Sequence, residues 1–270
     1  MTTPKDRPPI LKRFPSADLR RAWAEHAAEF VEWARKLGHD SYWQFHRDLL
    51  LPLIPSPGNR TLDLGCGEGR VSRDLKSIGH HVVGSDVSST MLAAAHEVDP
   101  SIEVVLADAA ALPFVDGSFD LAVAFMSFQD VDGVHRAVGE AARVLERGGR
   151  LCIAIVHPLN SAGAFESEEP DSPFVISGSY LEPSYYSYNV TRDGLEMTFV
   201  SAHRPLSVYA HSLADAGLLI ERLAEPTPPE HATETGRSRR VPMFLHIRAL
   251  KPEEPRTAGR AEDTGQGGQS

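Results

Sequence analysis

The stretch LDLGCGEG (62–69) decides the fold of this chain, because a short apolar run leads directly into glycines at every second position. Gly65, Gly67 and Gly69 remove the side chains that would keep a ligand away from the backbone amides at the start of the next helix. The spacing is GxGxG, whereas the dinucleotide fingerprint is GxGxxG and would place its third glycine at Arg70. The pattern therefore favours a smaller nucleoside ligand without a pyrophosphate.

Short β-rich runs alternate with helical periods on both sides of this loop. Such alternation is typical of a doubly wound parallel sheet, in which ligands bind at the carboxyl ends of the strands. Two runs near the C-terminus complete the expected sheet. The runs are TLDLG (61–65), HVVGSD (81–86), IEVVLAD (102–108), FDLAVAFM (119–126), RLCIAIV (150–156), LLIERLA (218–224) and VPMFLHIRAL (241–250).

Caps, stops and apolar periodicity mark the helical segments. Ser16 and Ser88 are candidate N-caps, and Gly38 and Gly148–Gly149 are candidate stops. The last helix precedes the two C-terminal strands. We expect helices over 16–38, over 40–51, from Ser88 onward, over 138–145 and over 207–216.

Composition and charge exclude several classes of protein. The chain has 270 residues, 41% of them hydrophobic, and a formal net charge of -10, which is opposite to the electrostatic footprint of a nucleic-acid binder. No apolar run approaches the roughly 18 residues of a membrane span, and no secretory signal is visible, so we expect a cytoplasmic protein. Cys66 and Cys152 have no partner at ligand spacing, so we expect no metal.

Two aspartates follow strands at the edge where a ligand would bind. Asp86 ends the second strand, about 20 residues beyond the glycine loop, and is placed to accept hydrogen bonds from ribose hydroxyls. Asp108 ends the third strand in the same way. The alternative for both is a helix cap or turn residue, since Asp favours such positions.

These motifs resemble the class I S-adenosylmethionine (SAM)-dependent methyltransferases, specifically the small-molecule, type 11-like subgroup. Four segments carry the resemblance in order, over about residues 58–157. They are LDLGCGEGR (62–70), VVGSDVSSTML (82–92), LADAAALPFVDGSFD (106–120) and AARVLERGGRL (141–151). The resemblance implies an α/β, Rossmann-like fold: a doubly wound, mostly parallel seven-stranded sheet with an N-terminal helical lid and a cap insertion before the last helix and strands.

The resemblance also implies a set of cofactor-binding residues for SAM and its product S-adenosylhomocysteine (SAH). The glycine loop would pass the methionine moiety, and Asp86 would bind the ribose. The adenine would lie against the segments after the second and third strands. The implied residues are Gly65, Cys66, Gly67, Asp86, Val87, Met91, Asp108, Ala109 and Phe125.

The N-terminal helices resemble a lid that folds over the cofactor in this family. Tyr42 and His46 share a helix face, where an aromatic ring gains cation–π attraction to a sulfonium and a hydroxyl or imidazole could hold the cofactor carboxylate. The alternative for both residues is plain core packing.

The acceptor side is less defined. Gln129 follows the fourth strand and is a candidate for substrate contact, but many relatives carry two histidines where this chain has Gln129 and Asp130. The candidates for a general base are therefore His157, Asp130 and His203, each of which could equally be a packed or surface residue.

An insertion rich in aromatic residues is expected to cap the site. It includes Tyr180 and suits a medium-sized, largely apolar acceptor, although the rings could equally pack the cap onto the sheet. We expect a disordered N-terminus (1–15), a helical lid (16–57), the cofactor-binding core (58–157), the cap (158–206), the last helix and strands (207–250) and a disordered tail (251–270).

The sequence thus predicts methyl transfer from SAM to O, N or C of a small, largely apolar biosynthetic metabolite, aromatic rings included, by in-line displacement. No nucleic acid or membrane partner is expected, and the protein would be a monomer or a homodimer. The alternatives are an enzyme of the same fold that binds SAM without transferring its methyl group, and a catalytically silent SAM-binding module.

Overall fold

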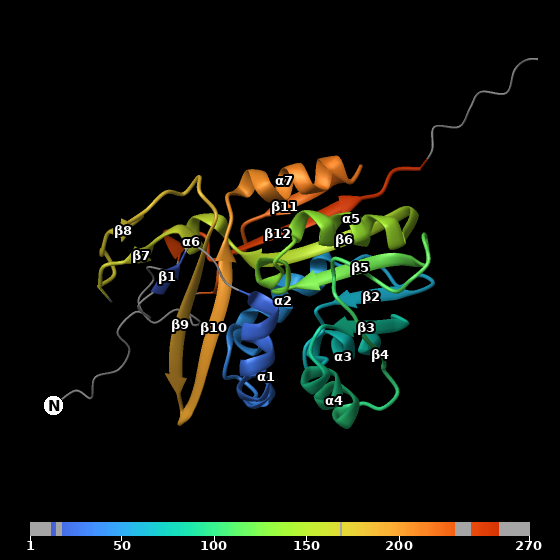
Figure 1. The fold of residues 1–270 in the computed structure, drawn as a ribbon, viewed down its shortest axis with the longest axis horizontal. Coiled ribbons are helices and arrows are strands. Elements are labelled where there is room, and N and C mark those ends of the chain that lie inside the picture. Colours follow the sequence, from blue (N-terminus) through green and yellow to red (C-terminus); the bar gives the residue numbers. More distant parts are fainter. Residues whose placement is uncertain (1–11, 15–17, 168, 230–238, 254–270) are drawn as a thin grey trace, which may run out of the picture.

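A seven-stranded sheet forms the centre of the molecule in the computed structural model, which describes residues 12–14, 18–167, 169–229 and 239–253 (Figure 1). The strand order is β11-β12-β6-β5-β2-β3-β4. The five neighbouring strands β6, β5, β2, β3 and β4 run parallel to one another. Only β12 pairs antiparallel, with β6 and with β11. The predicted mostly parallel seven-stranded sheet is confirmed. Its strands are β2 Thr61–Leu64, β3 Val82–Asp86, β4 Glu103–Leu106, β5 Phe119–Phe125, β6 Leu145–Val156, β11 Leu219–Ala224 and β12 Phe244–Leu250.

The central strands are apolar on both faces because helices cover both. In β5, Ala122 and Ala124 belong to the cluster under α5 Val134–Val144 and α7 Leu206–Asp215. Leu121 and Val123 point to the opposite face, toward α3 Arg70–Ser77. A parallel sheet buried on both sides requires such continuous apolar strands. The helix α4 Ser89–Val98 packs on β3 and β4, and Ser88 caps it as predicted.

The N-terminal segment forms one long helix and three short helical pieces. Asp18 caps α1 Leu19–Arg35 by accepting a hydrogen bond from the amide of Arg21, whereas the predicted cap Ser16 lies outside the described residues. The predicted second helix is helical throughout but not regular. It consists of a π-turn η1 Tyr42–His46, one α-turn α2 Arg47–Leu50 and a 3-10 turn η2 Leu51–Leu53.

The insertion after β6 contains regular strands that the sequence pattern did not predict. After α6 Pro158–Ala162 and the short pair β7 Ala164–Phe165 and β8 Phe174–Val175, a long hairpin is formed by β9 Ser184–Arg192 and β10 Leu195–His203. The hairpin lies against α1, away from the central sheet (Figure 1). Asp193 and Gly194 both have positive φ at its turn, which is typical of tight hairpins.

Two terminal segments expected to be disordered are partly ordered. Lys12–Phe14 forms β1 and pairs with β9, because the outer edge of the hairpin offers free backbone groups. The ammonium group of Lys251 donates to the carbonyls of Ala142 and Leu145 at 2.8 and 2.5 Å. The remaining residues of both predicted tails lie outside the described ranges.

The predicted stop of the helix before β6 is wrong in detail. Helix α5 ends at Val144, and β6 begins at the next residue, so Gly148 and Gly149 lie within the strand. A Cβ on Gly149 would lie 3.0 Å from the carbonyl oxygen of Asp120, so this glycine permits a close approach of two backbones. Among the described residues, no helix combines the length and apolarity needed to cross a membrane.

Candidate active site

One cavity of about 1130 Å³ opens at the carboxyl ends of the parallel strands. Its position follows from the strand order, because the chain leaves β2 toward β3 on one side and β5 lies on the other, which creates a crevice where strand order reverses. Residues at the ends of the sheet strands line one side, and residues of α1 and of the β9–β10 hairpin line the other. Of the residues predicted for the cofactor, those that line it are Gly65, Cys66, Gly67, Asp86, Val87, Met91, Asp108, Ala109 and Phe125.

The glycine loop after β2 is held in a conformation that glycine adopts without strain. Gly65 and Gly67 have φ of 69° and 55°. The amides of Gly65 and Cys66 both donate to the carbonyl of Ser85, at 2.8 and 2.9 Å. A Cβ on Gly65 would lie 2.5 Å from the Cβ of Ser127, and one on Gly67 would fill the space between the loop and the ring of Phe30. The sequence thus keeps this edge of the cavity free of side chains.

The carboxylate of Asp86 ties the loop to the start of α4. Its Oδ2 accepts from the amide of Gly67 at 2.9 Å, and its Oδ1 accepts from the amide of Ser88 at 2.8 Å. Burial raises the pKa of Asp86, and the backbone hydrogen bonds oppose that shift. Each carboxylate oxygen has a second lone pair, so Asp86 can hold the loop and still accept from a ligand hydroxyl.

A buried carboxyl group that the sequence analysis did not single out lies below the loop. Asp63 is 1% exposed, lines the cavity, and accepts from the hydroxyl of Ser72 at 2.6 Å. Burial raises the pKa of Asp63 to about 7. The signal was present in the sequence, since an acidic residue inside the apolar run TLDLG cannot be accommodated without a polar partner.

The second predicted carboxylate, Asp108, is paired with a residue of the lid. Its Oδ2 accepts from the guanidinium of Arg20 on α1, and its Oδ1 accepts from the amide of Ala110 at 2.9 Å. Both Asp108 and Arg20 line the cavity. No local pattern points to Arg20, because the two residues are 88 positions apart in the chain.

Aromatic side chains form the wall opposite the sheet. Trp23 and Phe30 come from one face of α1, and their rings meet edge to face at 5.4 Å. Tyr186, Tyr188 and Phe199 come from the hairpin, in which alternate residues of paired strands share a face. Tyr188 stacks on Phe199 with ring centroids 5.1 Å apart. Part of the predicted aromatic cap therefore lines the cavity.

A polar cluster lies where this wall meets the turn after β5, η3 Phe128–Asp130. The hydroxyl of Ser201 donates to Oδ1 of Asp130 at 2.6 Å, and Nε2 of Gln129 lies 3.3 Å from Oδ2. Burial raises the pKa of Asp130 to about 8. Oε1 of Gln129 is buried and has no hydrogen-bond partner among the described residues. Gln129, Asp130 and Ser201 all line the cavity.

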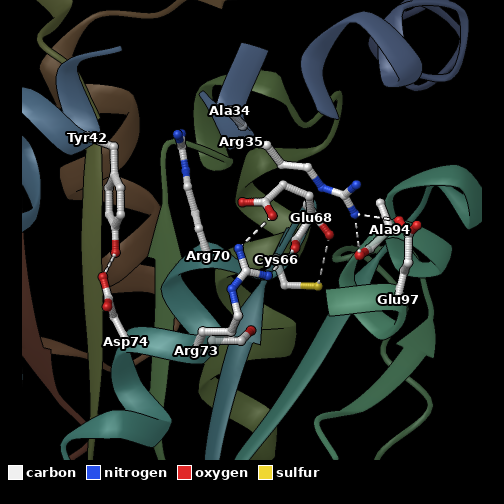
Figure 2. A network of polar contacts seen from close by, with 12 residues as sticks. Ala34, Arg35, Tyr42, Cys66, Glu68, Arg70, Arg73, Asp74, Ala94 and Glu97 are labelled. Atoms are coloured by element: carbon white, nitrogen blue, oxygen red, sulfur yellow. Dashed lines mark hydrogen bonds and ion pairs between the residues drawn. The ribbon is translucent and has the colours of Figure 1, made fainter. Parts of the chain in front are cut away.

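Tyr42 and His46 lie outside the cavity lining. Figure 2 shows the Tyr42 hydroxyl directed at Asp74, to which it donates at 2.5 Å. His46 is fully buried, with its Nε2 2.7 Å from Nε2 of His246. Arg70 lies beside Tyr42, with its guanidinium 4.7 Å from the centre of the Tyr42 ring. The same guanidinium donates to Asp40 at 2.5 Å. Arg70 is therefore the residue of this cluster that reaches the lining.

Three further predicted residues form hydrogen bonds within or next to the cap insertion and do not line the cavity. Nδ1 of His157 accepts from the amide of Leu159 at 3.0 Å and caps α6. His203 is fully buried, with Nδ1 2.8 Å from the hydroxyl of Ser161 and Nε2 2.9 Å from the carbonyl of Tyr180. The Tyr180 hydroxyl accepts from the amide of Leu206. Of the three base candidates, only Asp130 lines the cavity.

Comparisons with known proteins agree with this geometry. Residues 62–153 match the family model described as a methyltransferase domain. A crystal structure of a SAM-dependent methyltransferase from Mesorhizobium loti matches with a TM-score of 0.64 and 26% identity, covering 78% of this chain and 98% of that one. A structure from Listeria monocytogenes, at 20% identity and a TM-score of 0.63 over 78% of this chain and 97% of that one, shows the same fold.

The fold and the glycine loop are those of the class I SAM-dependent methyltransferases, and residues 62–153 match the methyltransferase domain model. SAM is the cofactor of that class, and the residues present fit it, since the side-chain-free edge at Gly65 and Gly67 adjoins the carboxylate of Asp86. Among curated relatives, a demethylmenaquinone methyltransferase from Beutenbergia cavernae is 39% identical over 147 residues, 54% of this chain. The match spans 56% of that relative, a little over half its length. In the described ranges, His, Cys, Asp and Glu side chains form no group of three that could hold a metal ion.

Proposed function

We propose that this protein transfers a methyl group from SAM to a small, largely apolar acceptor. One observation carries the proposal: a single cavity joins the glycine loop and Asp86 on the sheet side to an aromatic wall on the lid side. Such a cavity can hold a nucleoside cofactor and an acceptor next to each other, because its volume of about 1130 Å³ exceeds that of most single-ligand pockets.

The cofactor supplies a methyl group that the sulfonium has already activated. The protein's residues then have to hold the acceptor in line and exclude water, and such positioning is worth up to about 7 to 11 kcal/mol. We assign cofactor contacts to the loop at 65–67, to Asp86 for the ribose, and to Val87, Met91, Asp108 and Ala109 for the adenine end. The rings of Trp23 and Phe30 exclude water from the lid side.

An apolar acceptor is supported by the cavity and by the names of relatives. The relative from Beutenbergia cavernae is named for demethylmenaquinone, and one from a Ruegeria species for ubiquinone and menaquinone biosynthesis, at 38% identity over 50% of this chain and 58% of its own length. The wall built from Trp23, Phe30, Tyr188 and Phe199 suits a flat ring. We propose an acceptor of this general kind, aromatic and small enough for one cavity.

Titration calorimetry of the purified protein with SAM and SAH tests the cofactor step. Binding of both with micromolar dissociation constants, followed by turnover on an aromatic acceptor panel, is the expected result. Binding without turnover on hydroxylated, aminated and indolic rings would favour an enzyme that uses the fold without transferring the methyl group. No binding of either compound would contradict the proposal.

Asp86→Ala should remove most of the cofactor affinity while leaving the fold intact. Hydrogen bonds to a charged group contribute about 1.5 to 3 kcal/mol, so the dissociation constant for SAH should rise about ten- to hundredfold. Calorimetry measures the affinity, and circular dichroism checks the fold. The control is Asp215→Ala, an exposed carboxylate outside the cavity, which should bind SAH as the wild type does. Unchanged binding by folded Asp86→Ala protein would refute the assignment.

A further inference from the structure

The polar cluster at the end of the aromatic wall restricts which methyl acceptor can bind in the cavity. Asp130 and Gln129 lie in the turn η3 and carry hydrogen-bond acceptors. The hydroxyl of Ser201, on strand β10 of the hairpin, donates to Asp130 at 2.6 Å. Oε1 of Gln129 lacks a donor among the described residues. This oxygen is out of reach of a ligand in the cavity, so Asp130, which lines the cavity, is the hydrogen-bond acceptor that a ligand hydroxyl meets in this corner.

We propose that the methyl acceptor is a hydroxylated aromatic ring whose hydroxyl group binds at Asp130 and gives its proton to the Asp130 carboxylate. The inference rests on the proposed methyl transfer and specifies its acceptor. Asp130 would be the catalytic base, and Ser201 a positioning residue that acts through it.

The ring requirement follows from the position of the cluster. In the hairpin register, Ser201 pairs with Tyr186 and Phe199 with Tyr188, so the polar corner and the aromatic wall belong to one face of two adjacent strands. A group held at Asp130 therefore has its attached framework directed along this face. Planar rings gain offset-stacked or edge-to-face contacts there, which flexible chains do not.

The hydroxyl requirement follows from proton affinity as well as hydrogen bonding. Burial raises the pKa of Asp130 to about 8, against about 10 for a phenol, so the proton transfer is only modestly uphill. An aliphatic alcohol is far too weak an acid for this base, and a carboxylate acceptor would be repelled by it. The groups that face Asp130 from neighbouring elements are Gln129, Ser201, Arg204, Tyr186, Tyr188 and Tyr209.

The step balances without a further reactant. The hydroxyl proton passes to the Asp130 carboxylate, and an electron pair of the resulting phenolate forms the bond to the methyl carbon. The carbon–sulfur bond breaks, and its electron pair stays on sulfur. If the new bond forms at a ring carbon, that carbon loses its own proton to water as the ring regains aromaticity.

A binding experiment on the SAH-loaded protein tests the acceptor class. We expect 2-naphthol to bind at least tenfold more tightly than 2-methoxynaphthalene, and this preference to disappear in Asp130→Ala, which removes the hydrogen-bond acceptor. The control variant Asp215→Ala, which makes the same chemical change at an exposed site on α7, should keep the preference. Equal affinities, or a preference that survives in Asp130→Ala, would overturn the inference. Binding of SAH without binding of either naphthalene would overturn it while leaving the proposed methyl transfer intact.

The pH dependence of turnover separates the base from a structural role. On a naphthol that is turned over, kcat/KM should rise with pH through about 8 in the wild type, and Asp130→Asn should lower kcat about 100- to 10,000-fold. Ser201→Ala removes a hydrogen bond to the ionised carboxylate and should move this rise to higher pH. An identical pH profile in Ser201→Ala, or near-normal kcat in Asp130→Asn, would contradict the assignment. If the wild type failed to bind SAH, the proposed function itself would fall.

Discussion

At the scale of single residues, the site depends on backbone conformations that only certain residues adopt without cost. Gly65 has φ of 69° and faces Ser127 so closely that any Cβ would overlap its side chain. The same residue donates its amide to Ser85 and thereby joins β2 to β3 at the cavity edge. The absence of a side chain at Gly65 is thus both a folding requirement and a condition for ligand approach.

Gly65→Ala should destabilise the protein. The left-handed conformation costs about 1 to 2 kcal/mol for a residue with a Cβ, and overlap at 2.5 Å with the Cβ of Ser127 adds to it, so we expect a loss of about 2 kcal/mol or more. Urea unfolding measures the change. The matched control is Gly178→Ala, where no atom lies within 4 Å of the added Cβ and φ is not positive, so the change should be about 0.5 kcal/mol or less. Equal losses in both variants would contradict this account.

At the scale of elements, the irregular segment 42–53 is held to the sheet by a pair of buried histidines. The ring of His46 on η1 lies 4.8 Å from that of Phe125 on β5 and 4.0 Å from that of Phe244 on β12. Its Nε2 is 2.7 Å from Nε2 of His246, so one imidazole donates and the other accepts while both are neutral. Protonation of both would leave two donors facing each other. The hydrogen bond of the pair is therefore lost when both rings are protonated.

This pairing predicts a loss of stability in acid. Burial lowers the pKa of His246 from 6.5 to about 4, so the unfolded chain takes up a proton first as the pH falls. The stabilisation is complete above about pH 6.5 and is lost progressively toward pH 4, with a contribution of about 2 kcal/mol between pH 7 and pH 5.

Urea unfolding at pH 7 and pH 5 measures this contribution. The variant His246→Gln cannot titrate, and its stability should fall by about 2 kcal/mol less than that of the wild type over this interval. His135→Gln, at a histidine that is 63% exposed, should behave as the wild type does. The same acid loss in His246→Gln as in the wild type would rule out the pair as its source.

At the scale of the whole molecule, helix α1 lies between the β9–β10 hairpin and the central core (Figure 1). Helix α1 packs on β10, and Nε1 of Trp23 donates to the carbonyl of Val200 at 3.1 Å. Toward the core, Arg35 donates to the carbonyl of Ala94 and to Glu97 on α4, each at 2.8 Å (Figure 2). Arg20 bonds Asp108 after β4. These two arginines connect α1 to the core, and of the two only Arg20 lines the cavity.

Arg20→Ala should speed the release of SAH without unfolding the protein. The pair with Asp108 is largely exposed, at 57% and 35% for the two side chains, so the free energy of unfolding should change by less than about 1 kcal/mol. Losing one of the two bridges should raise the dissociation rate on the order of three- to tenfold, measured by stopped-flow displacement. Arg21→Ala is the control, since Arg21 pairs within α1 with Glu25. Equal rates in the two variants would show that the bridge does not retain the cofactor.

Local sequence patterns were sufficient to predict the sheet, the glycine loop and the carboxylates after its strands. These features arise from local patterns: apolar runs of strand length, glycines at fixed spacing, and aspartates where strands end, as at Asp86 and Asp108. The local cap at Ser88 was predictable for the same reason. Because parallel strands end at a common edge, the motifs also predict where the cavity lies.

Which residues face that cavity from the lid depends on packing between segments far apart in the chain. Tyr42 and His46 have the chemistry of cavity residues, but their polar atoms pair with Asp74 and His246, which lie 32 and 200 positions away. His157 is likewise engaged as the cap of α6. The aromatic wall required the pairing of β9 with β10 and their packing on α1. Contacts between distant segments determine these orientations, and local sequence patterns do not predict such contacts.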